Sequence, residues 1–262
     1  MSTSIITLTT DLGSRDHYAA SLKGTLLSLA PNAQLVDVSH DISPFNILEA
    51  AFILKSCFKK FPVGTIHMVA VDPEGTSRTD TVVMDYQGHR FIAPDNGVLS
   101  LIRMGDPAEC IKVDEAVMPP LSEGRSFLAL KRLAPSAALL ATGAEFDELG
   151  EEHTIKEFYW GEPSYTENSL RGVILHIDHF GNAITNITKD EFMRLKGSRS
   201  FQLFIRSLRL PRIVTSYGDV SKGEALAIFA ESGHLEIAIR EGSASQLLGL
   251  KVHDMLTIEY YE

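Results

Sequence analysis

Apolar and polar positions alternate along residues 1–155 in two different periods. Apolar runs over residues 5–10 and 66–71 have the length of buried strands, and each is followed by an aspartate. Between these runs, apolar residues recur at helical spacing over residues 16–29 and again over 44–58. Further strands are predicted over residues 33–38, 81–86, 91–93 and 111–113, and a further helix over 135–142. Strands that alternate with helices predict an α/β domain with a mainly parallel, twisted sheet.

The pattern changes between residues 150 and 170. Residues 156–164 mix aromatic, glycine and proline positions without a period, which is typical of a linker. Beyond it, short apolar runs are separated by turn dipeptides, and strands are predicted over residues 172–178, 201–205, 224–230, 234–238 and 255–260, with one helix over 188–196. We therefore predict two domains, 1–155 and 165–262, the second being a smaller antiparallel β-barrel.

Composition narrows the class of protein. The chain has 262 residues, with 24 basic and 34 acidic side chains, so its formal charge is -10. An acidic chain lacks the basic footprint of nucleic-acid binding. Cys57 and Cys110 have no CxxC or histidine spacing around them, which indicates free thiols in a reducing compartment. The first residues carry no signal-peptide pattern, and no apolar run reaches about 18 residues, so we expect a cytoplasmic protein without a membrane segment.

The common sequence motifs of nucleotide and hydrolase chemistry are missing. The chain contains no GxGxxG, GxxxxGK[ST], HExxH or GxSxG pattern. Their absence disfavours ordinary dinucleotide enzymes, P-loop NTPases, zinc proteases and α/β-hydrolases. The remaining signals are carboxylates, amides and turns at the ends of predicted strands.

Two acidic strand ends indicate a polar small-molecule site. In an open α/β sheet, ligands bind beyond the carboxyl ends of the strands, where Asp11 and Asp72 are expected. Asp11 can accept both hydroxyls of a ribose, or it can be a turn aspartate bonded to its own backbone. Asp72 and Arg78 can form either a loop-closing ion pair or a catalytic pair, in which the guanidinium keeps the carboxylate ionised.

Other polar positions have both a structural and a functional interpretation. Asn96, in Pro-Asp-Asn-Gly, is either a plain turn residue or a ligand contact. His40 is more simply explained as a structural histidine than as a catalytic one. His176, Asp178 and a neighbouring histidine resemble a metal cluster, but strand alternation separates them onto two faces, which disfavours a metal. Asp178 with Asn182 can instead hold the ammonium and carboxylate of an amino acid.

Taken in order along nearly the whole chain, these segments resemble the S-adenosyl-L-methionine (SAM) hydroxide adenosyltransferase family, hydrolases related to fluorinase and chlorinase. The matching segments are Thr9-Thr10-Asp11-Leu12-Gly13, Val36-Asp37-Val38-Ser39-His40-Asp41-Ile42, Pro44-Phe45, Val71-Asp72-Pro73, Ala93-Pro94-Asp95-Asn96-Gly97, Ile177-Asp178-His179-Phe180-Gly181-Asn182 and Gly233-His234-Leu235-Glu236-Ile237-Ala238.

The resemblance implies an α/β domain, a β-barrel domain and a homotrimer whose ligand lies between two protomers. It also implies attack of water or hydroxide at C5′ of SAM, giving adenosine and L-methionine. Because a sulfonium is already an activated leaving group, we expect that this reaction needs no metal or redox cofactor. By position, Asp11 would hold the ribose and Phe45 would pack near the ligand. The remaining implied ligand contacts are Asp178, Phe180 and Asn182, with Glu231 and Ser232 in a loop near the adenine.

The chain departs from the pattern of these hydrolases at one expected catalytic residue. They carry an Asp-Arg-His set around the water, and Asp72 and Arg78 match the first two members, across a shorter loop. Leu128 stands where the histidine is expected. Leucine cannot transfer a proton, so two alternatives stay open beside hydrolysis: a non-catalytic protein that binds SAM or adenosine, and a halogenase-like enzyme, since a halide needs no deprotonation.

Overall fold

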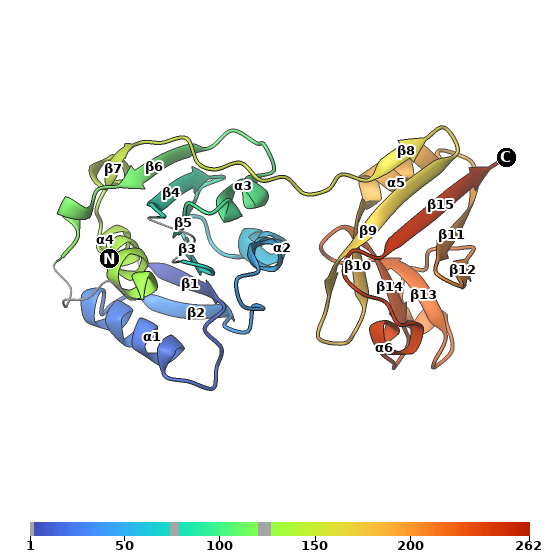
Figure 1. Ribbon diagram of the computed structural model, residues 1–262, viewed down its shortest axis with the longest axis horizontal. Helices are drawn as coiled ribbons and strands as arrows, with labels where there is room; N and C mark the ends of the chain where they lie inside the picture. The colour runs from blue at the N-terminus through green and yellow to red at the C-terminus, as the bar shows by residue number, and fades with distance from the viewer. Residues whose placement is uncertain (1–2, 74–78, 120–126) are drawn as a thin grey trace. The chain divides into compact units, whose positions relative to one another are not determined.

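The computed structural model describes residues 3–73, 79–119 and 127–262. The chain forms two compact units, Met1–Tyr159 and Trp160–Glu262 (Figure 1). Within the described ranges, no helix combines the length and the apolar character that crossing a membrane requires.

The first unit contains a seven-stranded mixed sheet in the order β2-β1-β3-β5-β4-β6-β7. Pairing is parallel across β2, β1, β3 and β5, and antiparallel across the rest. The predicted α/β class is confirmed, with the parallel strands at its core. The strands are β1 (Ile5–Thr10), β2 (Gln34–Ser39), β3 (Ile66–Ala70), β4 (Thr81–Tyr86), β5 (His89–Pro94), β6 (Glu109–Val113) and β7 (Gly150–Glu152).

A tight hairpin explains why the sheet stops being parallel. Gln87 and Gly88 connect β4 to β5 and have φ values of 52° and 80°. Two left-handed residues in a two-residue loop match the twist of paired antiparallel strands. The hairpin therefore reverses the chain at β4, and β6 and β7 extend the sheet as antiparallel strands.

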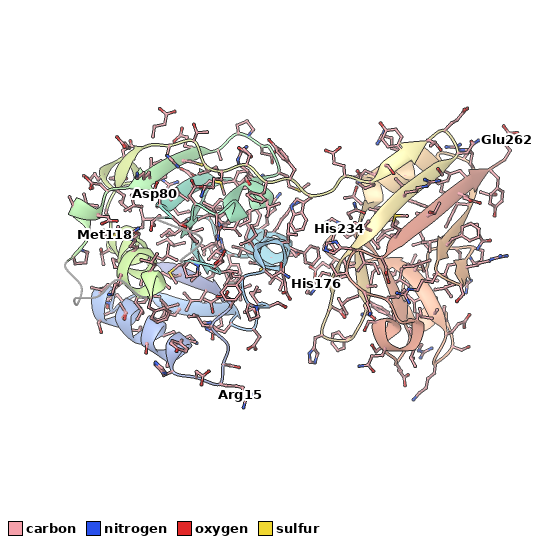
Figure 2. All side chains as sticks on the ribbon, in the orientation of Figure 1. Arg15, Asp80, Met118, His176, His234 and Glu262 are labelled. Carbon is pink, nitrogen blue, oxygen red and sulfur yellow. The ribbon has the colours of Figure 1, made fainter. Side chains whose placement is uncertain are left out.

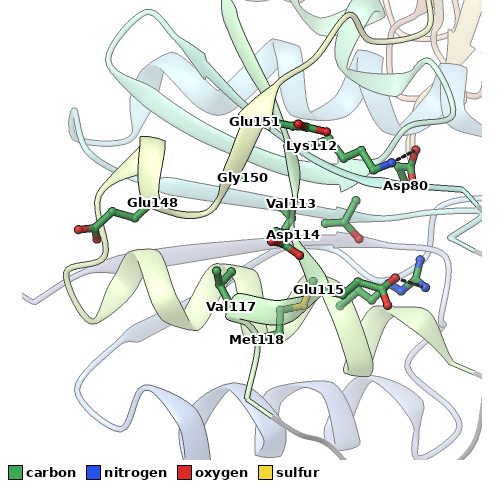
Figure 3. Close-up of a pocket in the computed structure, with 12 residues that line it drawn as sticks. Asp80, Lys112, Val113, Asp114, Glu115, Val117, Met118, Glu148, Gly150 and Glu151 are labelled. Carbon is green, nitrogen blue, oxygen red and sulfur yellow. Dashed lines mark ion pairs between the residues drawn. The ribbon is translucent and has the colours of Figure 1, made fainter.

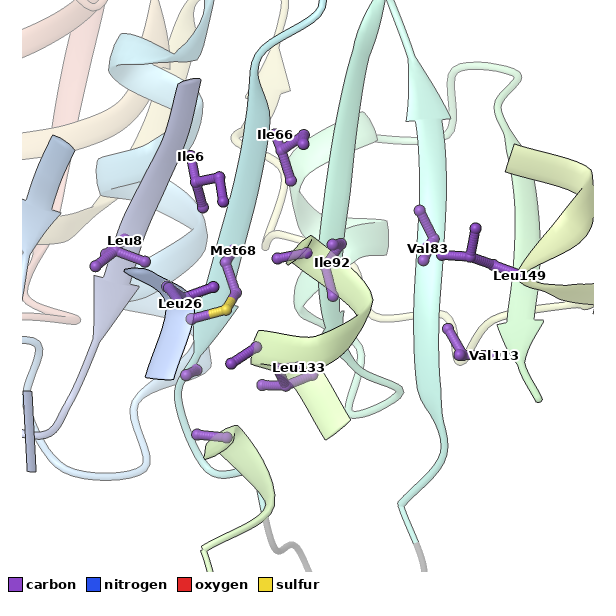
Figure 4. Close-up of a cluster of buried hydrophobic side chains, with 14 of the residues drawn as sticks. Ile6, Leu8, Leu26, Ile66, Met68, Val83, Ile92, Val113, Leu133 and Leu149 are labelled. Atoms are coloured by element: carbon purple, nitrogen blue, oxygen red, sulfur yellow. The ribbon is translucent and has the colours of Figure 1, made fainter. Parts of the chain in front are cut away.

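Helices cover both faces of this sheet. The helices are α1 (Tyr18–Leu29), α2 (Ile47–Cys57), α3 (Val98–Arg103) and α4 (Ala134–Ala141). Leu22 and Leu26 of α1 and Ala134 of α4 join the core on one face, where Leu8 and Met68 are fully buried (Figure 4). The opposite face carries Thr7, Thr9, His67 and Phe91, because successive strand residues alternate in direction. There the Phe58 ring, which directly follows α2, lies 5.3 Å from the ring of Phe91.

The second unit is an antiparallel, nearly closed barrel, which confirms the predicted architecture. Its strands follow the order β12-β11-β15-β9-β10-β14-β13. Strand β9 is nine residues long and pairs with both β15 and β10, so it joins the two halves of the sheet around one core. Its elements are β8 (Ser164–Thr166), β9 (Ser169–Ile177), β10 (Ala183–Thr188), α5 (Lys189–Lys196), β11 (Ser200–Ile205), β12 (Leu208–Leu210), β13 (Ala225–Phe229), β14 (His234–Ile239), α6 (Ala244–Leu248) and β15 (Met255–Tyr261).

Sequence patterns did not predict several short elements, among them α3, β7 and β10. Strand β10 is polar, yet Thr185 is fully buried and Asn186 is nearly so. The Asn186 side-chain oxygen accepts a hydrogen bond from the backbone N–H of Val173 at 2.8 Å, beside a register shift in the β9–β10 ladder. A side chain thus replaces a missing backbone partner, which an apolar pattern cannot indicate.

Candidate functional site

The Asp11 carboxylate lies at the carboxyl end of β1 and is held by two other loops. Its Oδ2 atom accepts the backbone N–H of Phe45 at 2.9 Å and that of Asp72 at 3.4 Å. These donors follow β2 and β3, the two strands that flank β1 in the sheet. The structure therefore brings three predicted site residues together at one sheet edge, across 34 and 61 positions of sequence.

Both donor residues have an unusual backbone conformation. Phe45 has φ of 66° and Asp72 has φ of 45°, in the left-handed region that residues with a Cβ seldom adopt. Such conformations cost about 1–3 kcal/mol each and persist where the surrounding structure imposes them. Here they turn two N–H groups toward one carboxylate. Non-glycine outliers of this kind concentrate at ligand-binding sites.

Asn96 stabilises the same sheet edge from β5. Its side-chain nitrogen donates to the carbonyls of Val71 at 3.0 Å and Asp72 at 3.3 Å, and its oxygen accepts the N–H of Val98 at 3.2 Å. These bonds connect the loop after β3 to the start of α3. Asn96 is therefore more than a plain turn residue, and it holds Asp72 in place through the backbone.

Phe45 adds a large apolar surface beside this carboxylate. The residue is 72% exposed, although its backbone N–H is bound to Asp11. An exposed aromatic face on a fixed backbone suits stacking against a planar ring.

The rest of the predicted catalytic set is less complete. Arg78 lies outside the described residues. Leu128 is partly buried and precedes a π-helical turn, Ala129–Leu133, that leads into α4. Phe127 just before it has φ of 66°, and its ring contacts that of Tyr18 edge-to-face at 5.5 Å. No imidazole stands at this position.

His40 does not substitute for the missing imidazole. Its Nδ1 atom is 2.8 Å from Thr10 Oγ1 and its Nε2 atom is 3.1 Å from Asp37 Oδ1. The ring is nearly buried, with 9% exposure of the residue. Because both ring nitrogens have protein partners, neither is available to a water molecule, which agrees with the structural interpretation of this residue.

In the second unit, Asp178 and Asn182 form a self-contained turn. The Asp178 carboxylate accepts the backbone N–H of Asn182 at 2.8 Å and its side-chain amide at 3.1 Å. Phe180 at the tip of this turn is 74% exposed. The structure brings the three predicted residues together locally, with the aromatic ring facing outward.

The predicted loop near the adenine is the turn between β13 and β14. Glu231 is exposed there, and the hydroxyl of Ser232 accepts the N–H of His234 at 3.5 Å. His234 and His176 lie on two different strands of this unit (Figure 2). In the described parts of the chain, no three His, Cys, Asp or Glu side chains are arranged to hold a metal ion.

The sequence pattern did not indicate that one glutamate of the second unit is buried. Glu236 on β14 is 3% exposed, and Tyr217 donates its hydroxyl to it at 2.6 Å. Burial is the main cause that raises the pKa of Glu236, and the negative charge of Asp178 raises it further, while the bond from Tyr217 opposes both. Its only sequence signal is one carboxylate inside the apolar run of residues 234–239.

A separate hollow of about 740 Å³ lies in the first unit (Figure 3). It is lined mostly by charged side chains, four of which form two ion pairs, Lys112 with Asp80 at 3.2 Å and Arg132 with Glu115. None of the predicted site residues lines this hollow. The predicted site residues therefore point to the Asp11 edge rather than to this hollow as the candidate site.

Two family models match almost the entire chain. Residues 6–150 match the SAM hydroxide adenosyltransferase N-terminal domain, and residues 172–257 match the C-terminal domain of the same family.

Individual relatives agree with these matches. A protein of Methanocaldococcus jannaschii named (R)-S-adenosyl-L-methionine hydrolase is 30% identical, with 98% of this chain and 96% of the relative covered. A fluorinase of an Actinoplanes species is 26% identical over 97% of each chain. A crystal structure of an uncharacterized conserved protein from Thermotoga maritima superposes with a TM-score of 0.88 at 28% identity, covering 97% of this chain and 99% of that one.

Proposed function

This chain belongs to the SAM hydroxide adenosyltransferase family, and we propose that it is an (R)-S-adenosyl-L-methionine hydrolase that forms adenosine and L-methionine. Membership of the family implies an adenosyl ligand. The (R) configuration at sulfur follows the names of the hydrolase relatives.

The Asp11 carboxylate is the observation that carries the proposal. Its Oδ2 atom is occupied by two backbone N–H groups, which hold the carboxylate at the sheet edge. A carboxylate at this place in an α/β fold accepts ribose hydroxyls. The exposed ring of Phe45 is available to pack against the ligand. These features fit the adenosine part of the substrate.

The reaction itself makes modest demands on the protein. Water attacks C5′ as the C5′–S bond breaks, and the bonding electron pair passes to sulfur, which becomes the neutral thioether of methionine. The oxygen becomes the 5′-hydroxyl of adenosine, and one proton is released. The sulfonium is already an activated leaving group, so rate enhancement comes from aligning a desolvated water opposite sulfur. The acidic strand ends also suit a cationic ligand.

We assign the orientation of the water to Asp72 with Arg78. The backbone of Asp72 is held on one side by Asp11 and on the other by Asn96, so its side chain extends from a fixed point. A carboxylate can accept a hydrogen bond from the attacking water and direct a lone pair at C5′. Leu128 contributes no proton transfer, so the proton leaves through Asp72 or bulk water.

Incubation with (R)-SAM in H₂¹⁸O tests the proposal. We expect equal amounts of adenosine and methionine, with one ¹⁸O in the adenosine 5′-hydroxyl, measured by mass spectrometry. Release of ¹⁶O adenosine in labelled water would contradict attack by water at C5′. Addition of chloride or fluoride tests the halogenase alternative, whose product is a 5′-halo-5′-deoxyadenosine.

Leu128 favours a second candidate function, which is binding of SAM or adenosine without turnover. Calorimetry separates the two, because a binding protein gives a stable complex with SAM and no adenosine. Under that alternative, Leu128→His restores the expected imidazole and creates turnover, with Leu130→His two residues away as the matched control. Turnover in the unmodified protein would exclude this alternative.

The two groups of predicted ligand residues lie in different units of the chain. We propose that they meet at the interface between subunits of a homotrimer, which analytical ultracentrifugation tests directly by a mass near three times 28.8 kDa. Both cysteines are free thiols, and we propose a cytoplasmic location on that basis.

A further inference from the structure

A continuous chain of polar side chains connects the surface of α1 to the end of β1, directly before Asp11. Lys23 Nζ contacts Asp37 Oδ2 at 2.6 Å, and Asp37 Oδ1 contacts His40 Nε2 at 3.1 Å. His40 Nδ1 then contacts Thr10 Oγ1 at 2.8 Å. Thr10 is fully buried, so its hydroxyl has no solvent alternative.

With a neutral His40 ring, the donors and acceptors of these side chains fit one arrangement. A carboxylate only accepts, so His40 donates its Nε2–H to Asp37. The Nδ1 atom of the neutral ring is then an acceptor, which receives the hydroxyl hydrogen of Thr10. The lone pairs of Thr10 Oγ1 then remain available, and one accepts the backbone N–H of Leu12 at 3.4 Å. Each side chain from Lys23 to Thr10 thus has a hydrogen-bond partner, and the bond to Leu12 lies on the other side of Asp11 in the sequence.

Backbone bonds between the same two loops reinforce this arrangement. The N–H of Gly13 donates to the carbonyl of His40 at 2.7 Å, and the N–H of Ile42 donates to the carbonyl of Thr10 at 3.3 Å. Asp11 thus lies between two residues, Thr10 and Leu12, that are both bound within this network. The loop that includes His40 continues to Phe45, whose N–H binds the Asp11 carboxylate.

We infer that Thr10, His40 and Asp37 form a positioning relay that sets the direction in which Asp11 presents its carboxylate to the ligand. The inference rests on the proposed function, since it assigns Asp11 to the ribose. His40 acts through Thr10 and touches no ligand, so it is a positioning residue. Both hydrogen bonds that the described residues donate to this carboxylate go to Oδ2, so Oδ1 is the atom whose placement the relay determines.

The chain supplies a matched control on the same strand. Thr7 is also fully buried in β1, and its Oγ1 contacts a histidine Nδ1, that of His67, at 2.7 Å. It lies on the opposite face of the strand from Thr10, three residues from it. Thr7→Val and Thr10→Val therefore remove the same hydroxyl–imidazole bond, but only the second removes it beside Asp11.

The test measures the dissociation constant of adenosine by calorimetry, below the melting temperature of each variant. We expect Thr10→Val to weaken adenosine binding by about tenfold, the equivalent of one lost hydrogen bond, and Thr7→Val to change it by less than about twofold. Thr10→Ser keeps the hydroxyl and should retain most of the affinity. In an Asp11→Asn background, Thr10→Val should cause no further loss, because the carboxylate that the relay directs is gone.

Equal effects of Thr10→Val and Thr7→Val would show that Thr10 acts through general stability, which overturns the relay. An undiminished effect of Thr10→Val in the Asp11→Asn background would overturn it as well. If Asp11→Asn itself leaves adenosine binding intact, the ribose assignment fails, and the relay fails with it. These outcomes separate an error in the relay from an error in the proposed function.

Discussion

Asp11 and Asp178 are both turn aspartates at strand ends, but their carboxylates are held by different kinds of partner. Asp178 is bound by Asn182, four residues away, and the turn closes on itself. Asp11 is bound by backbone N–H groups from Phe45 and Asp72, each on a separate loop. The first arrangement is built by local sequence, whereas the second exists only when three strands pair in the correct order.

The difference has a consequence for function. A local turn keeps its geometry when distant parts of the molecule change, so we expect Asp178 to act as a binding residue of stable position. The Asp11 edge depends on several loops with strained backbones, and it therefore transmits changes in one loop to the others. A reaction that needs exact alignment can therefore take place at the Asp11 edge only while the hydrogen bonds that hold this edge are intact.

The largest effect is expected from Asp72→Asn. Turnover of SAM should fall by about 10²–10⁴-fold, the range for loss of a group that positions or deprotonates a nucleophile. The affinity for SAM should change little, because the backbone N–H that binds Asp11 is kept. Single-turnover kinetics with a parallel binding measurement checks this. A variant with full turnover would place the water-orienting group elsewhere.

Removing the charge of Asp11 or of Asp178 should weaken the binding of a different part of the ligand in each case. Asp11→Asn should weaken adenosine binding by about 10- to 100-fold, as expected for lost charge-assisted hydrogen bonds, and leave methionine binding unchanged. Asp178→Asn should weaken methionine more than adenosine. Calorimetric titration of each variant with each product is the measurement. If Asp11→Asn weakened methionine binding and Asp178→Asn weakened adenosine binding, the two assignments would have to be exchanged.

Acid should affect the two units in opposite directions. Burial and the adjacent His89 lower the pKa of His67 to about 3. As the pH falls below about 6.5, His67 therefore becomes protonated in the unfolded chain but stays neutral in the folded first unit. Its stability is complete above pH 6.5 and falls as the pH falls, by about 2 kcal/mol at pH 5 from this residue. The pKa of Glu236 is raised instead, so folding of the second unit takes up a proton and gains stability as the pH falls toward 4.5.

Hydrogen exchange followed by mass spectrometry, corrected for intrinsic rates, resolves these trends by segment. Between pH 7 and pH 5, peptides from β3 and β5 should lose protection, whereas peptides from β14 should keep or gain it. His67→Gln and Glu236→Gln should each flatten the dependence of their own unit alone. Parallel behaviour of both units would show that neither residue dominates its unit.

The smallest effects are expected at the glycines of the two compared turns. Gly181 has φ of 83°, and a Cβ there would lie 2.0 Å from Ser243 Oγ, whereas Gly13 has φ of 70° and no atom within 4 Å of the same position. Gly13→Ala should cost about 1 kcal/mol of unfolding free energy for its left-handed backbone. Gly181→Ala should cost about 1–2 kcal/mol more because of the clash. Urea denaturation measures both, and equal losses would mean that the Ser243 side chain moves aside freely.

Much of the fold follows from periodicity that is visible in the sequence. The strand over residues 81–86 has the predicted bounds, and α5 starts where Thr188 and Glu191 cap each other as the sequence allows. The separation of an α/β half from an antiparallel β half is also evident. These features arise from interactions between near neighbours, since amphipathic period and caps depend on residues a few positions apart.

The sequence was less informative where a polar residue performs a structural task over a long distance. Asn96 carries a turn signal, but only the folded chain shows that it binds the carbonyls of Val71 and Asp72. The burial of Glu236 and the polar strand β10 were hidden for the same reason, because their partners Tyr217 and Val173 are distant along the chain.

Residue types and their order therefore determined that this chain has two kinds of β-structure, acidic strand ends and the segments of its family. Tertiary structure alone decided that Asp11 is held by Phe45 and Asp72, and that His40 is occupied at both nitrogens. The physical reason is that a hydrogen bond requires its two atoms within about 3.5 Å, and sheet topology, which local patterns leave open, brings those atoms together.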